Sequence, residues 1–338
     1  MPLVRRDGPP EARRRRAGAL ARGARGVRVF VAGATGAIGR PLVPRLLAAG
    51  HAVTAMTRYE ARAEAARAAG ADAVVCDVFE ADAVVRVVAG ARPDVVVNQL
   101  TDIPSKLDPR KYEEQMGGLN RIRSQGYRNL VRAAREAGAR KLVAQSISFI
   151  YAPASDPAAA PPATEDDPLW EDAPEPFATT LRATIEGERA VLDSGLEPLL
   201  LRYGWFYGPG TQYAADGATT EMIRRRRYPI VGDGAGVSSF IHVDDAADAT
   251  VAAVSSSATG ILNVVDDDPA PLREWLPAVA ETIGAKRPLR VPAFAARVAA
   301  GTFAVAFSTR QRGASNARAK QALGWAPAHP TWRGTLGT

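Results

Sequence analysis

A glycine-rich turn between an apolar segment and a helix constrains this chain more than any other stretch. Residues 27–40 read Val-Arg-Val-Phe-Val-Ala-Gly-Ala-Thr-Gly-Ala-Ile-Gly-Arg. The apolar residues at the start predict a strand, residues from about 38 to 49 predict a helix, and a second strand is predicted at 51–57. A strand, a tight turn, a helix and a further strand in this order form the opening β-α-β unit of a parallel sheet.

The three glycines of this turn, three positions apart, have separate predicted roles. Gly33 lets the chain turn sharply off the strand, Gly36 lets backbone N–H groups approach a phosphate, and Gly39 lets the helix pack closely on the strand. The helix N-terminus offers unpaired N–H groups and a partial positive charge to a diphosphate. The alternative is a tight turn without a ligand. The predicted dinucleotide contacts here are Gly33, Thr35, Gly36, Ala37, Ile38, Gly39 and Arg40.

Strands and helices alternate through the first half of the chain. Further strands are predicted at 73–78, 94–100, 141–148 and 198–203, with helices at 60–69, 81–89, 112–137 and 179–194. This alternation predicts an α/β fold with a doubly wound parallel sheet of the Rossmann type. We expect residues 27–203 to form mainly the NAD(P)-binding domain. Residues 204–338 would form mainly a smaller C-terminal substrate lobe, with 240–265 returning to the core.

The end of the second predicted strand bears on which dinucleotide binds. An acidic residue at this position accepts hydrogen bonds from the adenosine ribose of NAD, whereas an arginine suits the 2′-phosphate of NADP. Met56, Thr57 and Arg58 include no acid, and Arg40 can add a second cation. This pattern favours NADP(H), with NAD(H) as the alternative if Arg58 is only a solvated surface residue.

The basic character of the chain is concentrated at its start. The net charge is +7, and residues 1–28 contain nine arginines but only Asp7 and Glu11 as acids. The remaining chain is neutral and gives no electrostatic reason to expect nucleic-acid binding. We interpret residues 1–26 as a disordered basic tail, with a nucleic-acid or membrane contact as the alternative.

Two absences bear on the compartment and the partners. The sequence has no run of about 18 apolar residues, so no transmembrane helix is predicted. Cys76 is the only cysteine, which excludes an internal disulfide and fits a reducing cytoplasm. The expected partner is therefore a small-molecule substrate, with no nucleic acid and no membrane.

Four segments together resemble the extended and atypical short-chain dehydrogenase/reductases, a family that includes nucleotide-sugar epimerases and dehydratases. They are residues 33–39, 202–210, 240–247 and 323–327, and they occur in the order found in the family. The resemblance implies an NAD(P)-dependent enzyme. Family members often dimerise through helices such as those predicted at 112–137 and 179–194, so a homodimer is among the assemblies that the resemblance implies.

The resemblance also implies where the cofactor lies. It places the adenine near Asp77 and Val78, although Asp77 is equally consistent with a turn or helix-capping aspartate. It places the nicotinamide half near the ends of the fourth and fifth strands and near the loop after the sixth. The residues at these positions are Leu100, Thr101, Ser146 and residues 203–205.

One departure from the family concerns the catalytic pair. The family usually uses Tyr-x-x-x-Lys, in which the lysine lowers the tyrosine pKa and the tyrosinate exchanges a proton with the substrate. No tyrosine of this chain is followed four positions later by a lysine. Counting back from Arg202 places Thr180 and Thr184 at the two positions, and a looser register places Phe177 and Leu181 there.

A reductase of a carbonyl needs another proton donor. The candidate catalytic residues are Tyr151 at the end of the fifth strand, Ser146 and Ser148 beside it, and Tyr207 from the second lobe. Each has a structural alternative, since a buried tyrosine often serves packing and a serine often fixes a loop backbone.

A second departure concerns the substrate. Nucleotide-sugar enzymes commonly have an arginine near position 238 that grips the sugar diphosphate, and this chain has Ser238. We therefore predict an NADPH-dependent reductase of a small, fairly apolar carbonyl or enone. The alternatives are an NAD(P)-dependent epimerase or dehydratase, and a non-catalytic dinucleotide-binding sensor or scaffold.

Overall fold

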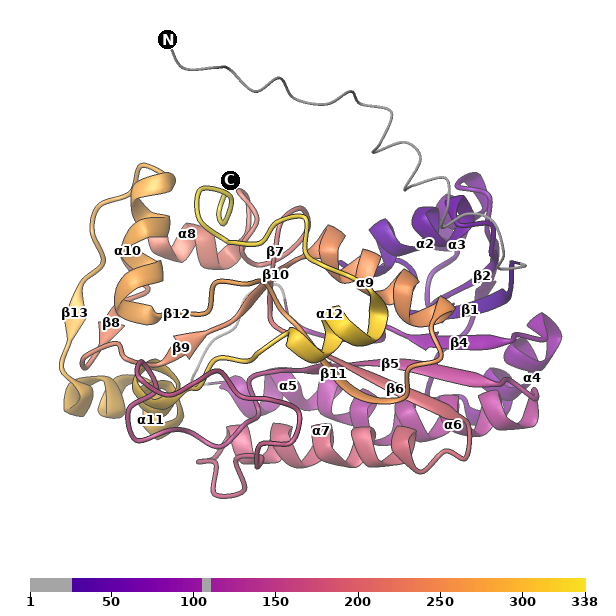
Figure 1. Cartoon of the computed structure of the whole chain (residues 1–338), viewed down its shortest axis with the longest axis horizontal. Coiled ribbons are helices and arrows are strands. Elements are labelled where there is room, and N and C mark those ends of the chain that lie inside the picture. Colours follow the sequence, from indigo (N-terminus) through magenta and orange to yellow (C-terminus); the bar gives the residue numbers. More distant parts are fainter. Residues whose placement is uncertain (1–25, 105–110) are drawn as a thin grey trace, which may run out of the picture.

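A seven-stranded parallel sheet forms the centre of the computed structural model, which describes residues 26–104 and 111–338 (Figure 1). The strand order is β11-β6-β5-β4-β1-β2-β3, and all neighbouring strands run parallel. The strands are β1 (Arg28–Ala32), β2 (Ala52–Thr57), β3 (Asp72–Val75), β4 (Val95–Asn98), β5 (Lys141–Ile147), β6 (Glu197–Tyr203) and β11 (Gly260–Val264). The predicted Rossmann-type fold is confirmed.

Helices cover both faces of this sheet. One face carries α2 (Gly39–Ala48), α3 (Glu60–Ala68) and α9 (Val243–Ser255). The other carries α4 (Ala81–Ala91), α5 (Tyr112–Arg121), the π-helical turn η2 (Ile122–Gly126), α6 (Tyr127–Glu136) and α7 (Phe177–Leu192). Alternate residues of β1 enter the two cores, because successive side chains of a strand point to opposite faces. Val29 and Val31 pack under α2 and α9, whereas Phe30 and Ala32 pack under α4 and α6.

The helix predicted at 112–137 is not continuous. The turn η2 interrupts it between α5 and α6. This turn lies where α7 comes closest, since a Cβ on Gly187 would be 2.5 Å from the carbonyl oxygen of Arg123. A π-helical turn changes the direction in which the following side chains point, and such turns are frequent at functional sites.

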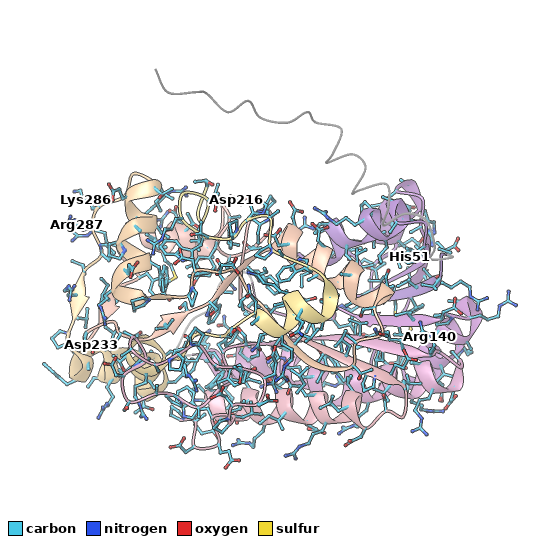
Figure 2. The ribbon with its side chains drawn as sticks, viewed as in Figure 1. His51, Arg140, Asp216, Asp233, Lys286 and Arg287 are labelled. Atoms are coloured by element: carbon cyan, nitrogen blue, oxygen red, sulfur yellow. The ribbon has the colours of Figure 1, made fainter. Side chains whose placement is uncertain are left out.

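The remaining elements form a smaller lobe beyond the carboxyl ends of the strands. Arg140, directly before β5, marks the amino ends of the strands, and Lys286 and Arg287 lie at the far side of the smaller lobe (Figure 2). The elements of this lobe are β7 (Trp205–Tyr207), α8 (Ala218–Arg224), β8 (Ile230–Val231), β9 (Val237–Ser238), β10 (Phe240–His242), β12 (Ala270–Pro271), α10 (Leu272–Thr282), β13 (Arg290–Val291) and α11 (Ala293–Arg310). Helix α12 (Ala317–Leu323) then packs on β11.

The core of the smaller lobe is aromatic. Phe240, Trp275 and Trp332 are buried together in it. Helix α11 is bent at Gly301, whose φ of 84° is not helical. The chain returns from this lobe to the sheet through α9 and β11. Residues 1–25 of the predicted tail lie outside the described residues, and no helix of the described ranges is long and apolar enough to cross a bilayer.

Candidate active site

The three glycines of the turn after β1 meet different surroundings. Gly33 has a φ of 82°, and a Cβ there would lie 2.3 Å from the carbonyl oxygen of Gln99. A Cβ on Gly39 would lie 2.4 Å from the carbonyl oxygen of Gly33. A Cβ on Gly36 would meet nothing nearer than 3.4 Å. The packing of the protein itself therefore requires Gly33 and Gly39, whereas Gly36 borders open space that a ligand can use.

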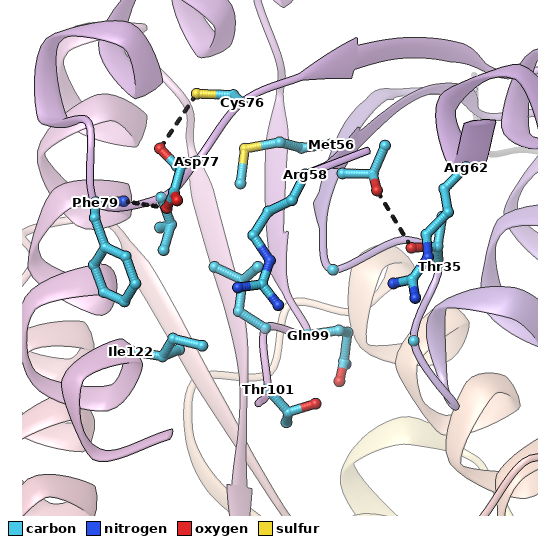
Figure 3. Close-up of a pocket in the computed structure, with 15 residues that line it drawn as sticks. Thr35, Met56, Arg58, Arg62, Cys76, Asp77, Phe79, Gln99, Thr101 and Ile122 are labelled. Atoms are coloured by element: carbon cyan, nitrogen blue, oxygen red, sulfur yellow. Dashed lines mark hydrogen bonds between the residues drawn. The ribbon is translucent and has the colours of Figure 1, made fainter. Parts of the chain in front are cut away.

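A pocket with an empty volume of about 590 Å³ opens beside this turn (Figure 3). It lies where the strand order reverses between β1 and β4, the usual ligand position in open parallel sheets. The predicted contacts that line it are Gly33, Thr35, Gly36, Arg58, Asp77, Val78, Leu100 and Thr101. The lining residues that sequence reasoning missed are Met56, Thr57, Arg62, Cys76, Phe79, Gln99 and Ile122.

Two arginines give this pocket a positive charge. Arg58 follows β2 and Arg62 lies in the first turn of α3, and Figure 3 shows both guanidinium groups projecting into the pocket, with Arg62 beside Thr35. The acid paired with Arg58 is Asp102, whose Oδ1 is 3.5 Å from Nη2, a long contact between exposed groups. Such a pair contributes little, so Arg58 remains available to an anion.

Arg40 was the second cation expected here, and it lines a neighbouring surface pocket that also includes Thr35 and Arg62. A Cβ on Gly210 would lie 2.3 Å from Nη2 of Arg40, so this guanidinium lies against the turn at 208–210 of the smaller lobe. Arg62 is the second arginine that lines the pocket beside the glycine turn. The spacing of four residues between Arg58 and Arg62 is the signal that could have identified it. Ala37 and Ile38 lie in the turn that leads into α2, and their contacts with a dinucleotide stay a prediction.

Asp77 closes a turn at the end of the pocket where the adenine is expected. Its Oδ1 accepts a hydrogen bond from the backbone N–H of Phe79 at 3.0 Å, and the residue that precedes α4 is Glu80. Asp77 is therefore a turn residue and not the helix cap. It also lines the pocket together with Val78, Phe79 and Ile122, which present apolar surface.

Ser146 and Tyr151 belong to a buried network at the other end of the site. The Oγ of Ser146 donates to Oε1 of Glu188 at 2.6 Å. Arg202 donates to both oxygens of the same carboxylate, from Nε at 2.8 Å and Nη2 at 2.6 Å. Its Nη1 donates to the Tyr151 hydroxyl at 3.0 Å, and that hydroxyl donates to Oδ1 of Asn263 at 2.7 Å. The side chains of Arg202 and Glu188 are only 3% and 5% exposed.

This network determines the protonation state of the Tyr151 phenol. Burial raises its phenol pKa, while the charge and hydrogen bond of Arg202 and the hydrogen bond to Asn263 act in the opposite direction. The phenol is thus neutral at physiological pH, with its donor and acceptor capacity used inside the protein. The same holds for the hydroxyl donor of Ser146. Both residues stay predictions as proton donors, and their contacts are those of structural groups.

The other two candidate donors are also buried. Ser148 lies directly after β5, and its backbone N–H donates to the carbonyl of Tyr203 at 2.8 Å. The hydroxyl of Tyr207 donates to the carbonyl oxygen of Thr331 at 3.3 Å, and burial raises the pKa of its phenol. The interaction with Thr331 ties Tyr207 to the C-terminal segment of the smaller lobe.

The two α7 positions expected from the sequence for the family pair, Thr180 and Thr184, are buried threonines, and Thr184 lies beside a buried arginine. Thr184 donates its hydroxyl to the carbonyl of Thr180 at 2.7 Å and accepts a hydrogen bond from Nη1 of Arg123 at 2.8 Å. Sequence reasoning did not identify Arg123, because only the docking of η2 on α7 brings it to Thr184.

Aromatic side chains from both lobes meet between this network and the smaller lobe. Phe149, just after β5, stacks on Trp205 of β7 with ring centroids 4.1 Å apart and an angle of 5°. Phe307 of α11 lies edge-on to both, at 5.9 and 6.0 Å. A small cavity, with an empty volume of about 300 Å³, adjoins Trp205 and Phe307 and includes Ser238 in its lining. This part of the site suits a planar apolar group.

Known proteins of similar sequence and structure include reductases and epimerases. Residues 29–264 match the NAD dependent epimerase/dehydratase family. A 3-diazoavenalumate denitrifying reductase from a Streptomyces species is 50% identical over 313 residues, which cover 92% of this chain and 99% of that protein. A 2-alkyl-3-oxoalkanoate reductase from Stenotrophomonas maltophilia is 27% identical over 77% of each protein. The solved UDP-glucose 4-epimerase of Thermus thermophilus, in complex with NAD, has a TM-score of 0.67 and 25% identity over 91% of this chain and 96% of that one.

Proposed function

We propose that this chain, which belongs to the NAD-dependent epimerase/dehydratase family, is an NADPH-dependent reductase. Its substrate would be a small, largely apolar molecule that carries a carboxylate group. Its relatives are named reductases and epimerases, so the chain is an NAD(P)-dependent enzyme and the non-catalytic alternative is set aside. The choice of dinucleotide and the class of substrate are the parts that we propose.

The pocket beside the glycine turn supports NADPH as the cofactor. The space over Gly36 is open to a diphosphate, and Arg58 and Arg62 supply positive charge where an NAD-binding fold has an acid. Asp77, Val78 and Ile122 line the end suited to the adenine. When bound, this cofactor supplies a hydride, and the protein supplies binding and orientation.

Two classes of hydride acceptor differ in what they require of the protein. A carbonyl that gains a hydride on carbon must also gain a proton on oxygen, which calls for a proton donor. A carbon that bears a cationic diazo group gains the hydride as a new C–H bond while its C–N bond breaks. Dinitrogen leaves with the electrons of that bond, and no proton is needed at the reacting carbon.

The hydroxyls of Tyr151 and Ser146 are both hydrogen-bonded to other groups of the protein. This observation favours the second class of hydride acceptor, the diazo compound. Both hydroxyls donate to buried acceptors, Asn263 and Glu188, and neither Tyr-x-x-x-Lys position of α7 holds a phenol or an ammonium. The relative at 50% identity is named for a diazo substrate and for removal of nitrogen. We therefore propose reductive loss of dinitrogen from a diazo-substituted conjugated carboxylate.

Reduction of a small carbonyl or enone is the second candidate. It is supported by the relative that is named a 2-alkyl-3-oxoalkanoate reductase. Ser148, which lies directly after β5, would be its first candidate proton donor. Epimerisation of a nucleotide sugar has less support, because Ser238 offers no charge to a diphosphate.

A matched pair of acceptors separates the two classes. The protein is incubated with NADPH and either 4-diazoniobenzoate or 4-acetylbenzoate, and oxidation of NADPH is followed together with release of ¹⁵N₂ from labelled diazonium. Heat-inactivated protein gives the uncatalysed rate. We expect one dinitrogen per NADPH oxidised with the diazonium, and slow turnover of the ketone.

Faster reduction of the ketone, without catalysed release of dinitrogen, would favour the carbonyl candidate. Catalysis of neither reaction, by protein that still binds NADPH and with an extended panel of diazo, ketone and enone carboxylates, would contradict the reductase proposal.

A further inference from the structure

Arg123 is a buried cation without an acidic partner in residues 26–104 and 111–338. It lies in η2 between α5 and α6 and is 7% exposed. Its side-chain hydrogen bond goes to the neutral hydroxyl of Thr184, at 2.8 Å. The other buried arginine of this region, Arg202, differs sharply, because it holds a carboxylate with two hydrogen bonds.

The charges near Arg123 do not balance. Glu188 is the acid that acts on it electrostatically, and Arg202 and Ser146 already occupy the oxygens of that carboxylate. Two guanidinium groups therefore share one carboxylate. Burial lowers the pKa of Arg123, and Glu188 and two tyrosines act in the opposite direction. A guanidinium nonetheless stays charged in proteins, so the region has one uncompensated positive charge.

Polar groups around Arg123 also lack partners. The hydroxyl of Thr180, which is 2% exposed, and Oδ1 of Asn120 are buried without a hydrogen bond in the described part of the chain. Tyr112 lies next to them, since the Thr180 hydroxyl and the charge of Arg123 both act to lower its phenol pKa against the larger effect of burial. Thr180 is near this phenol without reaching normal hydrogen-bond geometry. Unpaired buried polar groups are rare in native proteins, and each calls for an explanation such as a bound water or a ligand.

A series of aromatic rings in contact joins Tyr112 to the stacked pair of Phe149 and Trp205. Tyr112 lies 5.5 Å from Phe303 of α11, measured between ring centroids, and Phe303 lies 4.7 Å from Phe307. Phe307 in turn contacts the stacked pair of Phe149 and Trp205. Phe303 and Phe307 are only partly buried, so they leave aromatic surface on which a conjugated molecule can pack.

We propose that Arg123 is the residue that binds the carboxylate of the substrate. Thr184 accepts a hydrogen bond from one nitrogen of the guanidinium, and Arg123 makes no other side-chain hydrogen bond within residues 26–104 and 111–338. The remaining N–H groups can bind a carboxylate, for which the planar guanidinium is well suited. Thr180 adds a hydroxyl donor. The carboxylate supplies the missing negative charge. This assignment rests on the proposed function for the class of substrate, but it concerns binding and can be tested without turnover.

The test compares an anionic ligand with its neutral ester. Calorimetry measures the Kd of trans-cinnamate and of methyl trans-cinnamate in the presence of saturating NADP⁺, for the wild type, Arg123→Met and Arg123→Lys. Arg128→Met is the matched control, because Arg128 also reaches α7, where it pairs with Glu186, but on the exposed surface. We expect cinnamate to bind at least tenfold more weakly to Arg123→Met and to recover in part with Arg123→Lys. The ester should bind equally to all four proteins.

Thermal unfolding of the same variants separates binding from structure. Removal of an uncompensated buried charge should leave the Tm of Arg123→Met unchanged or higher, whereas a structural role would lower it. Wild-type protein that binds cinnamate no better than the ester, or binds neither, would overturn the proposal, as would equal loss of both ligands in Arg123→Met. These outcomes do not depend on the acceptor assay, so failure of the reductase proposal would be seen separately.

Discussion

The two ends of the site handle charge in opposite ways. At the cofactor end, Arg58 and Arg62 face an open pocket, and among the described residues the acid nearest to them is Asp102, 3.5 Å from Arg58. At the opposite end of the site, which we call the closed end, Glu188 and Arg202 are buried and paired with each other. The first end is built to receive an anion, and the second holds its charges in fixed places. Arg123 combines both properties, because it is buried like the second pair and unpaired like the first.

Glu188→Gln should have the largest effect on stability. It leaves Arg202 buried without its carboxylate, and removal of one partner of a buried ion pair costs about 3–5 kcal/mol. Urea denaturation measures the change in the free energy of unfolding. Glu186→Gln is the control on the same helix, since its pair with Arg128 is exposed and should contribute below about 1 kcal/mol. Equal losses in the two variants would show that the closed end does not depend on its ion pair.

Arg58→Ala should act on only one of the two dinucleotides. If its guanidinium contacts the 2′-phosphate, NADPH binding should weaken by roughly 1.5–3 kcal/mol, the scale of a charged hydrogen bond, and NADH binding should barely change. Arg62→Ala should behave in the same way. Arg67→Ala, on the same helix as Arg62 but paired with Glu60, is the control for titration calorimetry. An equal loss of affinity for NADPH and NADH would contradict the assignment of NADP(H) as the cofactor.

Gly36→Ala should weaken both dinucleotides without unfolding the protein. The added Cβ meets no protein atom nearer than 3.4 Å, but it enters the space over the turn. We expect about a tenfold loss of affinity, about 1.4 kcal/mol, and an unchanged Tm. Gly39→Ala should instead lower the Tm, because its Cβ would lie 2.4 Å from the backbone. Unchanged affinity of Gly36→Ala for both dinucleotides would contradict the proposal that the diphosphate binds over this turn.

Tyr151→Phe should have the smallest effect on catalysis. The variant loses the hydrogen bonds to Asn263 and Arg202, which should cost about 1–3 kcal/mol of stability because buried partners are left unpaired. The kcat for 4-diazoniobenzoate should change less than about threefold. A general acid contributes on the order of 10²–10⁴ to a rate, so a loss of that size would identify Tyr151 as the proton donor.

The cofactor end could be predicted from sequence because its signals are local. The spacing of Gly33, Gly36 and Gly39 and the position of Arg58 after β2 are set by one β-α-β unit. The exception is instructive. Arg40 lies next to the same turn in sequence, but it lines a neighbouring pocket and contacts the loop around Gly210, which is far away in the chain. Arg62 is in the pocket because of the geometry of α3.

The closed end could not be predicted in this way, because its contacts join distant segments. The hydrogen bond of Ser146 to Glu188 spans 42 positions, and that of Arg123 to Thr184 spans 61. Both depend on how α7 docks against β5 and η2, and the turn η2 itself carries no recognised sequence signal. The sequence therefore identifies Tyr151 and Ser146 as polar residues at the end of β5, but their partners are visible only in the folded chain.

Isotope tracing tests the reductase proposal most directly. The protein is supplied with 4-diazoniobenzoate and NADPH deuterated at either face of C4, in ordinary water. We predict that one of the two labelled cofactors yields benzoate with one deuterium at the carbon that lost nitrogen, for each dinitrogen released. Unlabelled NADPH in D₂O should yield no deuterium at that carbon. Deuterium from the solvent, or product without the label of either cofactor, would contradict hydride transfer to a diazo substrate.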